Sequence, residues 1–182
     1  MDRALLIIDY TNDFVADNGA LTCGKPGQEI EGYVTDLTTS FLKKKEFVIF
    51  GVDLHEKDDI YHPETKLFPP HNIRGTKGRE LYGRLAEVYE SAKASPFTYW
   101  MDKTRYSAFA GTDLDMQLRA RGIQELHLVG VCTDICVLHT AMDAYNYGYD
   151  IHIHQQGVAS FNNVGHDFAL KHFEQTLGAV LH

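Results

Sequence analysis

The segment ELHLVGVCTDICV, residues Glu125–Val137, gives the strongest indication of how this chain folds. Its apolar run Leu126–Val131 has the length of a buried strand, and a helical pattern follows over Asp134–Tyr147. Cys136 is therefore expected in the first turn of a helix, where unpaired backbone N–H groups carry partial positive charge and favour a thiolate. The segment predicts a nucleophilic cysteine, with a buried structural cysteine as the alternative.

Apolar runs and helical patterns alternate along the rest of the chain. The runs expected to form strands are Ala4–Ile8, Glu46–Val52, Phe97–Met101, Leu126–Val131 and Tyr149–His154. The expected helices are Glu29–Lys44, Gly78–Glu90, Asp113–Arg121, Asp134–Tyr147 and Gly165–Val180. This alternation predicts a doubly wound α/β fold, with a mainly parallel sheet and helices on both faces. The carboxyl ends of the strands in such a sheet meet along one edge, where ligands bind.

The composition suits one domain over residues 1–182. Of these residues 44% are apolar, and no linker, repeat or low-complexity tract divides the chain. The net charge of −8 argues against a nucleic-acid partner, and no apolar run is long enough to span a membrane. An odd number of cysteines, without an export signal, predicts a location in the reducing cytoplasm. We expect a homo-oligomer that acts on a small molecule.

Polar residues at the ends of the expected strands form a candidate catalytic group. Asp9 follows the first run, Lys103 follows the third, and Cys136 lies beyond the fourth. A cysteine nucleophile needs a group that accepts the thiol proton, and a nearby lysine would stabilise both negative charges. The N–H groups of Cys132 and Cys136 are candidates for an oxyanion hole. The combination predicts acyl transfer through a thioester, although Asp9 as a turn cap and Lys103 as a solvated side chain are the simpler alternatives.

A second group of polar residues follows the second expected strand. Asp53 and His55 leave this strand two residues apart and can point to the same side. The loop that follows adds His62, Glu64 and His71. Imidazole and carboxylate ligands together suit one divalent ion of zinc, iron or manganese. Spacing does not separate His62 from Glu64 as the fourth ligand, and a merely solvated polar loop is the alternative.

These residues belong to motifs with a family resemblance. The motifs are Asp9-Tyr-Thr-Asn-Asp-Phe14, Asp53-Leu-His55, Phe68-Pro-Pro-His71, Lys103 with Tyr106, and Gly130-Val-Cys-Thr-Asp-Ile-Cys136. In order and spacing they resemble the isochorismatase-like cysteine hydrolases, and within these the bacterial nicotinamidases.

The resemblance implies a role for each matching residue. Asp9, Lys103 and Cys136 would form the catalytic triad, and a cis peptide bond would precede the oxyanion-hole residue Cys132. The resemblance also implies that the aromatic residues Phe14, Phe68 and Tyr106 stack against the substrate, and that Leu21 forms a further wall of the substrate pocket. It further implies the hydrolysis of nicotinamide, and of pyrazinamide, with a metal ion, zinc first of all, that orients the pyridine ring.

Two positions depart from the family pattern. Thr11 stands where many relatives have glutamine, so the support of Asp9 is expected to differ. Tyr61 stands where many nicotinamidases have a third histidine ligand, and the resemblance to streptococcal members suggests Glu64 in its place. A cysteine amidohydrolase for carbamoyl or ureido substrates is the main alternative. An isochorismatase that cleaves vinyl ethers would generally lack the cysteine, and a non-catalytic binding protein would not need the complete triad.

Overall fold

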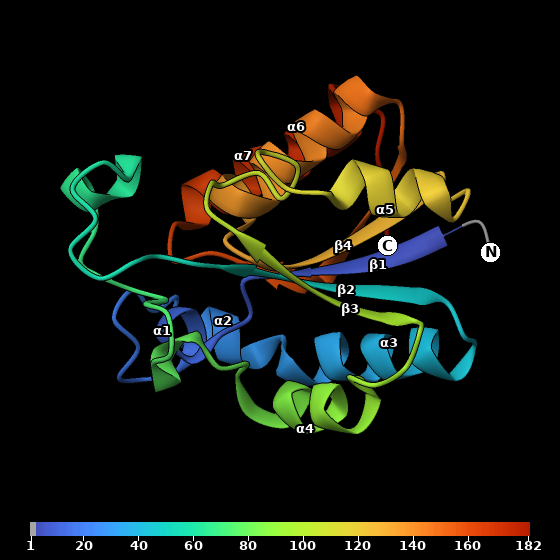
Figure 1. The fold of residues 1–182 in the computed structure, drawn as a ribbon. Helices are drawn as coiled ribbons and strands as arrows, with labels where there is room; N and C mark the ends of the chain where they lie inside the picture. The colour runs from blue at the N-terminus through green and yellow to red at the C-terminus, as the bar shows by residue number, and fades with distance from the viewer. Residues whose placement is uncertain (1–2) are drawn as a thin grey trace.

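A parallel sheet forms the centre of the molecule, and the computed structural model describes it within residues 3–182 (Figure 1). The strands lie in the order β3-β2-β1-β4-β5-β6. Their bounds are Arg3–Ile8 (β1), Phe47–Asp53 (β2), Thr98–Lys103 (β3), Glu125–Val131 (β4), Asp150–Ala159 (β5) and Val180–Leu181 (β6). Because the order reverses between β1 and β4, a crevice for ligands is expected at the carboxyl ends of these central strands.

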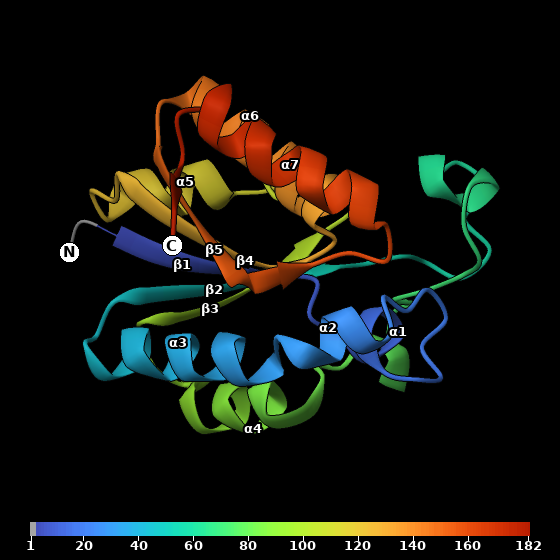
Figure 2. The same cartoon turned by 180° about the vertical axis from the view of Figure 1, so that it is seen from behind.

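Helices cover both faces of the sheet. α3 and α4 lie on one face, and α5, α6 and α7 lie on the other, as the two opposite views show (Figures 1 and 2). The bounds are Asn12–Val15 (α1), Lys25–Glu29 (α2), Glu31–Lys43 (α3), Gly83–Ala92 (α4), Leu114–Ala120 (α5), Leu138–Tyr147 (α6) and Asn163–Gln175 (α7). Two 3-10 turns span Pro63–Lys66 and Lys77–Arg79, and a π-helical turn spans Thr133–Val137.

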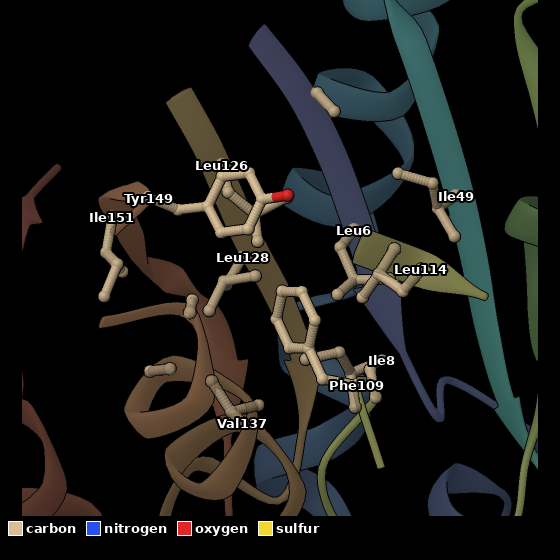
Figure 3. Close-up of a cluster of buried hydrophobic side chains, with 14 of the residues drawn as sticks. Leu6, Ile8, Ile49, Phe109, Leu114, Leu126, Leu128, Val137, Tyr149 and Ile151 are labelled. Carbon is tan, nitrogen blue, oxygen red and sulfur yellow. The ribbon is translucent and has the colours of Figure 1, made fainter. Parts of the chain in front are cut away.

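Alternation along the strands divides the core into two apolar layers. In β1, Leu6 and Ile8 face α5, α6 and α7, where they pack with Leu128 and Phe109 (Figure 3). Leu5 and Ile7 face α3 on the other side. The residues on both faces of this strand are buried. This explains why the central strands appear in the sequence as continuous apolar runs rather than as an alternating pattern.

The structure confirms the α/β class, and four of the five expected strands lie within two residues of their expected bounds. The fifth, β5, was expected to end at His154 but continues to Ala159. The last helix was predicted to reach Val180, and this is wrong. The helix ends at Gln175, Gly178 has a φ of 65°, and Val180–Leu181 pairs with β5 as β6. Glycine adopts this left-handed conformation without steric cost and so permits the turn into the strand.

The start of the predicted helix Gly78–Glu90 is also wrong. α4 begins only at Gly83, because Leu81 forms an antiparallel bridge with Thr11, and the N–H of Tyr82 donates to the carbonyl of Tyr10. This pairing ties the segment after β1 to the chain before α4. In the described part of the chain, no helix is long and apolar enough to cross a membrane.

Gly130 is where β4 passes closest to β1. Its φ is 118°, and a Cβ atom built there would lie 2.0 Å from the carbonyl oxygen of Ile8. We expect Gly130→Ala to lower the free energy of unfolding by about 3 kcal/mol or more, since it adds backbone strain to overpacking between central strands. Gly148 is the control, because its φ is 79° but its Cβ would meet no atom within 4 Å. Gly148→Ala should cost about 1 kcal/mol in urea unfolding, and equal costs would contradict the close-approach argument.

Candidate active site

Asp9 lies directly after β1 in an unusual backbone conformation. Its φ is 55°, in the left-handed region that few residues other than glycine adopt. The conformation is held because the N–H of Asp9 donates to the carbonyl of Gly51 at 3.0 Å. Its side chain is fully buried, and Oδ1 accepts the N–H of Asp53 at 2.8 Å. Strain of this kind persists where the surrounding structure fixes a functional group, and here it aims the carboxylate at the strand ends.

Lys103 brings its ammonium group to the same point from the end of β3. Its Nζ lies 2.8 Å from Oδ2 of Asp9, 3.4 Å from Oδ1 of Asp53 and 3.7 Å from Sγ of Cys136. Burial by itself lowers the pKa of Lys103, but the charges of Asp53 and Asp9 outweigh this effect and raise that pKa well above its ordinary value. Lys103 is therefore a buried cation between two carboxylates.

Cys136 lies in the π-helical turn that follows β4, and not in the first turn of an α-helix as predicted. Burial raises the pKa of its thiol well above the ordinary value, although the Lys103 charge opposes this rise. The structure therefore does not favour the thiolate that the sequence predicted, because desolvation of the buried sulfur outweighs the attraction of Lys103.

Asp9 complements the neutral thiol. Burial raises the pKa of Asp9 to about 6, with Lys103 opposing the rise, so this carboxyl is mostly ionised at neutral pH. A neutral thiol beside a weakly basic carboxylate is suited to proton transfer as the sulfur attacks, rather than before it.

The peptide bond between Val131 and Cys132 is cis, as the family resemblance implied. The carbonyl of Cys132 accepts the N–H groups of Ile135 and Val137, which ties the end of β4 to the π-helical turn. The Cys132 sulfur lies 3.2 Å from the sulfur of Cys23 and is buried. The side chain of Cys132 thus contacts Cys23, while its backbone carbonyl is bonded to the turn that contains Cys136.

A narrow, mainly apolar pocket opens beside Cys136. All the residues predicted to contact a substrate line it, namely Phe14, Leu21, Phe68 and Tyr106. Cys132, Cys136 and Glu64 also line it, together with two residues that the sequence analysis missed, Ile135 and Phe161. Ile135 directly precedes Cys136, and Phe161 lies two residues after the end of β5. Their position at the ligand-binding edge of the sheet is the sequence feature from which both could have been predicted.

Asp53, His55, Glu64 and His71 form a second buried cluster next to this pocket. One ligand atom from each lies within 4.8 Å of the others. Nε2 of His71 lies 3.6 Å from Oδ2 of Asp53 and 3.5 Å from Oε2 of Glu64, and it is buried without a hydrogen-bond partner. Nδ1 of the same ring lies 2.8 Å from the carbonyl of Pro69, to which it donates, so Nε2 is the ring nitrogen that can coordinate a metal ion. Two carboxylates and two imidazoles arranged in this way fit a divalent metal ion.

His62 has a different place in the structure. Its Nδ1 accepts the N–H of Glu64 at 3.3 Å, and its Nε2 lies 2.8 Å from the carbonyl of Thr104, to which it donates. Both ring nitrogens are engaged, so His62 caps the 3-10 turn that carries Glu64. Tyr61 is 88% exposed and contributes nothing to the cluster. The geometry therefore favours Glu64 over His62 as the fourth ligand.

The side chain of Thr11 supports this cluster rather than the carboxylate of Asp9. Its hydroxyl donates to Oδ1 of Asn72 at 2.9 Å, and the N–H of Asn72 donates to Oδ2 of Asp13 at 2.7 Å. Asn72 has a φ of 45° and follows His71 directly. Thr11 thus holds the side chain of Asn72, and Asp13 holds its backbone N–H, directly after a candidate metal ligand.

Comparison with known proteins agrees with this architecture. The isochorismatase domain matches residues 3–182, and the chain belongs to this family. Its fold is similar to that of the nicotinamidase/pyrazinamidase of Bacillus subtilis, with 60% identity and a TM-score of 0.98 over 100% of this chain and 99% of that one. The pyrazinamidase/nicotinamidase of Streptococcus mutans is 51% identical, with a TM-score of 0.98 over 100% of both chains. The pyrazinamidase of Pyrococcus horikoshii, solved in complex with zinc, is 25% identical, with a TM-score of 0.87 over 100% of this chain and 99% of that one.

The two candidates for the fourth ligand can be separated by metal analysis. We expect Glu64→Ala to weaken zinc binding at this cluster by more than about 100-fold, since even the partners of metal ligands contribute 10–100-fold. His62→Asn, which keeps an acceptor for the cap, should bind zinc as the unmodified protein does. The measurement is zinc affinity by competition with a chromogenic chelator. A loss of zinc in His62→Asn, with normal affinity in Glu64→Ala, would reverse the assignment.

Proposed function

We propose that this protein is a nicotinamidase, which hydrolyses nicotinamide to nicotinate and ammonia, and that it also accepts pyrazinamide. The proposal is carried by one observation: Cys136, whose sulfur lies beside the buried Lys103–Asp9 pair, lines the same aromatic pocket as a candidate metal ligand, Glu64. A substrate in this pocket can thus place its amide carbon beside the sulfur of Cys136 and its ring toward the candidate metal ligands. The similarity to the nicotinamidases of B. subtilis and S. mutans supports the same substrate.

The first half of the reaction forms a thioester. Sγ of Cys136 attacks the carboxamide carbon while its proton passes to Asp9. We assign the oxyanion to the backbone N–H groups of Cys132 and Cys136, both of which line the pocket. Asp9 then returns the proton to the departing nitrogen, and ammonia leaves.

The second half releases the acid. A water molecule attacks the thioester carbon and gives a proton to Asp9, and the sulfur of Cys136 leaves and takes that proton back. Asp9 therefore acts alternately as base and acid, a task that suits a carboxyl group with a pKa of about 6. Lys103 stabilises the negative charge that moves between Asp9 and the sulfur, because it lies within 3.7 Å of both.

Asp53, His55, Glu64 and His71 are proposed to hold one divalent ion, which we assign as zinc. When bound, the ion would offer a coordination position to the pyridine nitrogen of the substrate. The residues around it would then hold the ring: Phe14 and Phe68 pack against His71, with ring centroids at 5.2 and 6.3 Å. Such positioning of the amide against the sulfur can contribute several kcal/mol to the lowering of the barrier. The zinc complex of the P. horikoshii relative supports this choice of metal.

The remaining expectations also stand as proposals. We propose a single domain that works in the cytoplasm on a small molecule, without a nucleic-acid partner, as the charge of −8 and the free cysteines suggest. Exposed apolar residues on the arm between β2 and α4, namely Ile60, Tyr61 and Leu67, suit contacts within a homo-oligomer. Figure 1 shows this arm projecting from the sheet edge.

Replacing the three cysteines one at a time tests the nucleophile. Cys136→Ala should lower kcat for nicotinamide by at least about 10⁴-fold, as expected when a covalent nucleophile is removed. Cys23→Ala and Cys132→Ala should keep activity within about tenfold, since neither sulfur takes part in the chemistry. Ammonia release gives the rate, and circular dichroism verifies folding. Substantial turnover by a folded Cys136→Ala would rule out the thioester.

A small panel of amides separates this function from its main alternative. Nicotinamide and pyrazinamide should be hydrolysed, and removal of the metal with a chelator should raise the KM for both. Benzamide, which lacks the ring nitrogen, is the matched control and should react slowly with little effect of the chelator. Faster ammonia release from carbamoyl or ureido compounds than from nicotinamide would favour the other class of amidohydrolase.

A further inference from the structure

A cluster of histidines lies outside the candidate active site. It occupies the amino-terminal part of β4 and β5 and the residue after β6, at the end of the sheet opposite to Cys132. The rings pack against one another with centroids between 4.6 and 5.7 Å apart, and residues of α3 cover the innermost ones. The members are His127, His152, His154 and His182, with Glu125 beside them.

Hydrogen bonds determine which nitrogen atoms of the inner histidines carry protons. Nε2 of His127 lies 2.6 Å from a carboxylate oxygen of Glu125, so this nitrogen must be the donor. Nδ1 of the neutral His127 ring then holds a lone pair and accepts from Nε2 of His154 at 2.8 Å. The other nitrogen of His154, Nδ1, accepts the hydroxyl of Tyr33 at 2.8 Å. A single proton thus lies between two ring nitrogens that face each other.

We propose that this cluster is a second metal site, which binds a divalent transition-metal ion of the zinc class through His127, His154 and His182. One ring nitrogen of each lies within 4.8 Å of the others. Zinc would replace the proton between His127 and His154, and their nitrogens would separate by about 0.5 Å to reach tetrahedral Zn–N distances of about 2.0–2.1 Å. The displaced proton would pass to solvent. A water molecule would complete the coordination.

The surroundings suit metal ligands. Glu125 accepts from the outer nitrogen of His127, the carboxylate–histidine–metal arrangement that orients an imidazole ligand and makes it more basic. The hydroxyl of Tyr33 can accept from Nδ1 of His154 once Nε2 of that ring binds the ion.

The position of the third ligand suggests what the ion would do. His182 is exposed, whereas His127 and His154 are buried, so an ion can enter from solvent and reach the inner rings. The N–H of His182 donates to the carbonyl of Ile153 at 2.9 Å, next to the two-residue strand β6. A bound ion would add a bond between this short edge strand and both β4 and β5. It would thereby act as a structural clamp at the edge of the sheet.

Zinc titration of the metal-depleted full chain tests this site. The unmodified protein should bind one more zinc ion per chain than His182→Ala, whatever number the candidate active site takes up. His154→Gln should lose the same ion. His172→Ala, on α7 and outside the cluster, is the matched control and should bind as the unmodified protein does. Stoichiometry comes from calorimetry and elemental analysis after gel filtration.

A second readout tests the clamp. Zinc should raise the Tm of the unmodified protein by more than it raises that of His182→Ala, since only the former holds the extra ion in its folded state. Nicotinamide hydrolysis by His182→Ala should be unchanged, which separates this result from any failure of the proposed function. Equal zinc stoichiometry in the unmodified protein, His182→Ala and His154→Gln would overturn the proposal and leave the cluster as a hydrogen-bonded chain of imidazoles.

Discussion

The buried ammonium group of Lys103 is the interaction on which the rest of the site depends. It lies within 3.4 Å of carboxylates from two other strand ends, Asp9 and Asp53. Each of these charges would be very unfavourable alone in the interior, and removing one partner from such a group typically costs 3–5 kcal/mol. Lys103 therefore makes it possible to bury both carboxylates, and it ties the ends of β1, β2 and β3 together at the ligand-binding edge.

Asp53 connects the two halves of the site. One of its oxygens faces Lys103, the other lies 2.7 Å from Nε2 of His55, and its backbone N–H holds Asp9. The charge at the candidate metal cluster and the basicity of Asp9 are consequently coupled through one residue. Arg79 anchors the same corner, because its guanidinium donates to the carbonyls of Asp53 and Val52.

Much of this could be predicted from the sequence, because buried parallel strands leave long apolar runs and polar residues at their ends. Asp9, Lys103 and Cys136 were expected at one edge for that reason, and they meet there. The protonation state of Cys136 could not be predicted, since it depends on desolvation in three dimensions. The role of His62 as the cap of a 3-10 turn could not be predicted either, because sequence spacing does not show which ring nitrogens form hydrogen bonds. β6 was missed because two residues are too few to form a pattern.

The loop between β2 and α4 gives the two halves of the site different local stabilities. Asp9 and Cys136 adjoin the central strands β1 and β4, which are buried on both faces and should open only when the whole sheet unfolds. Glu64 and His71 instead belong to an arm with exposed apolar side chains, held to the sheet edge through Thr11, Asp13 and the backbone of His55. Local opening of this arm would expose the candidate ligands while the catalytic group stays in place. Metal exchange would then follow the amide hydrogen exchange of the arm, and it would proceed faster than global unfolding.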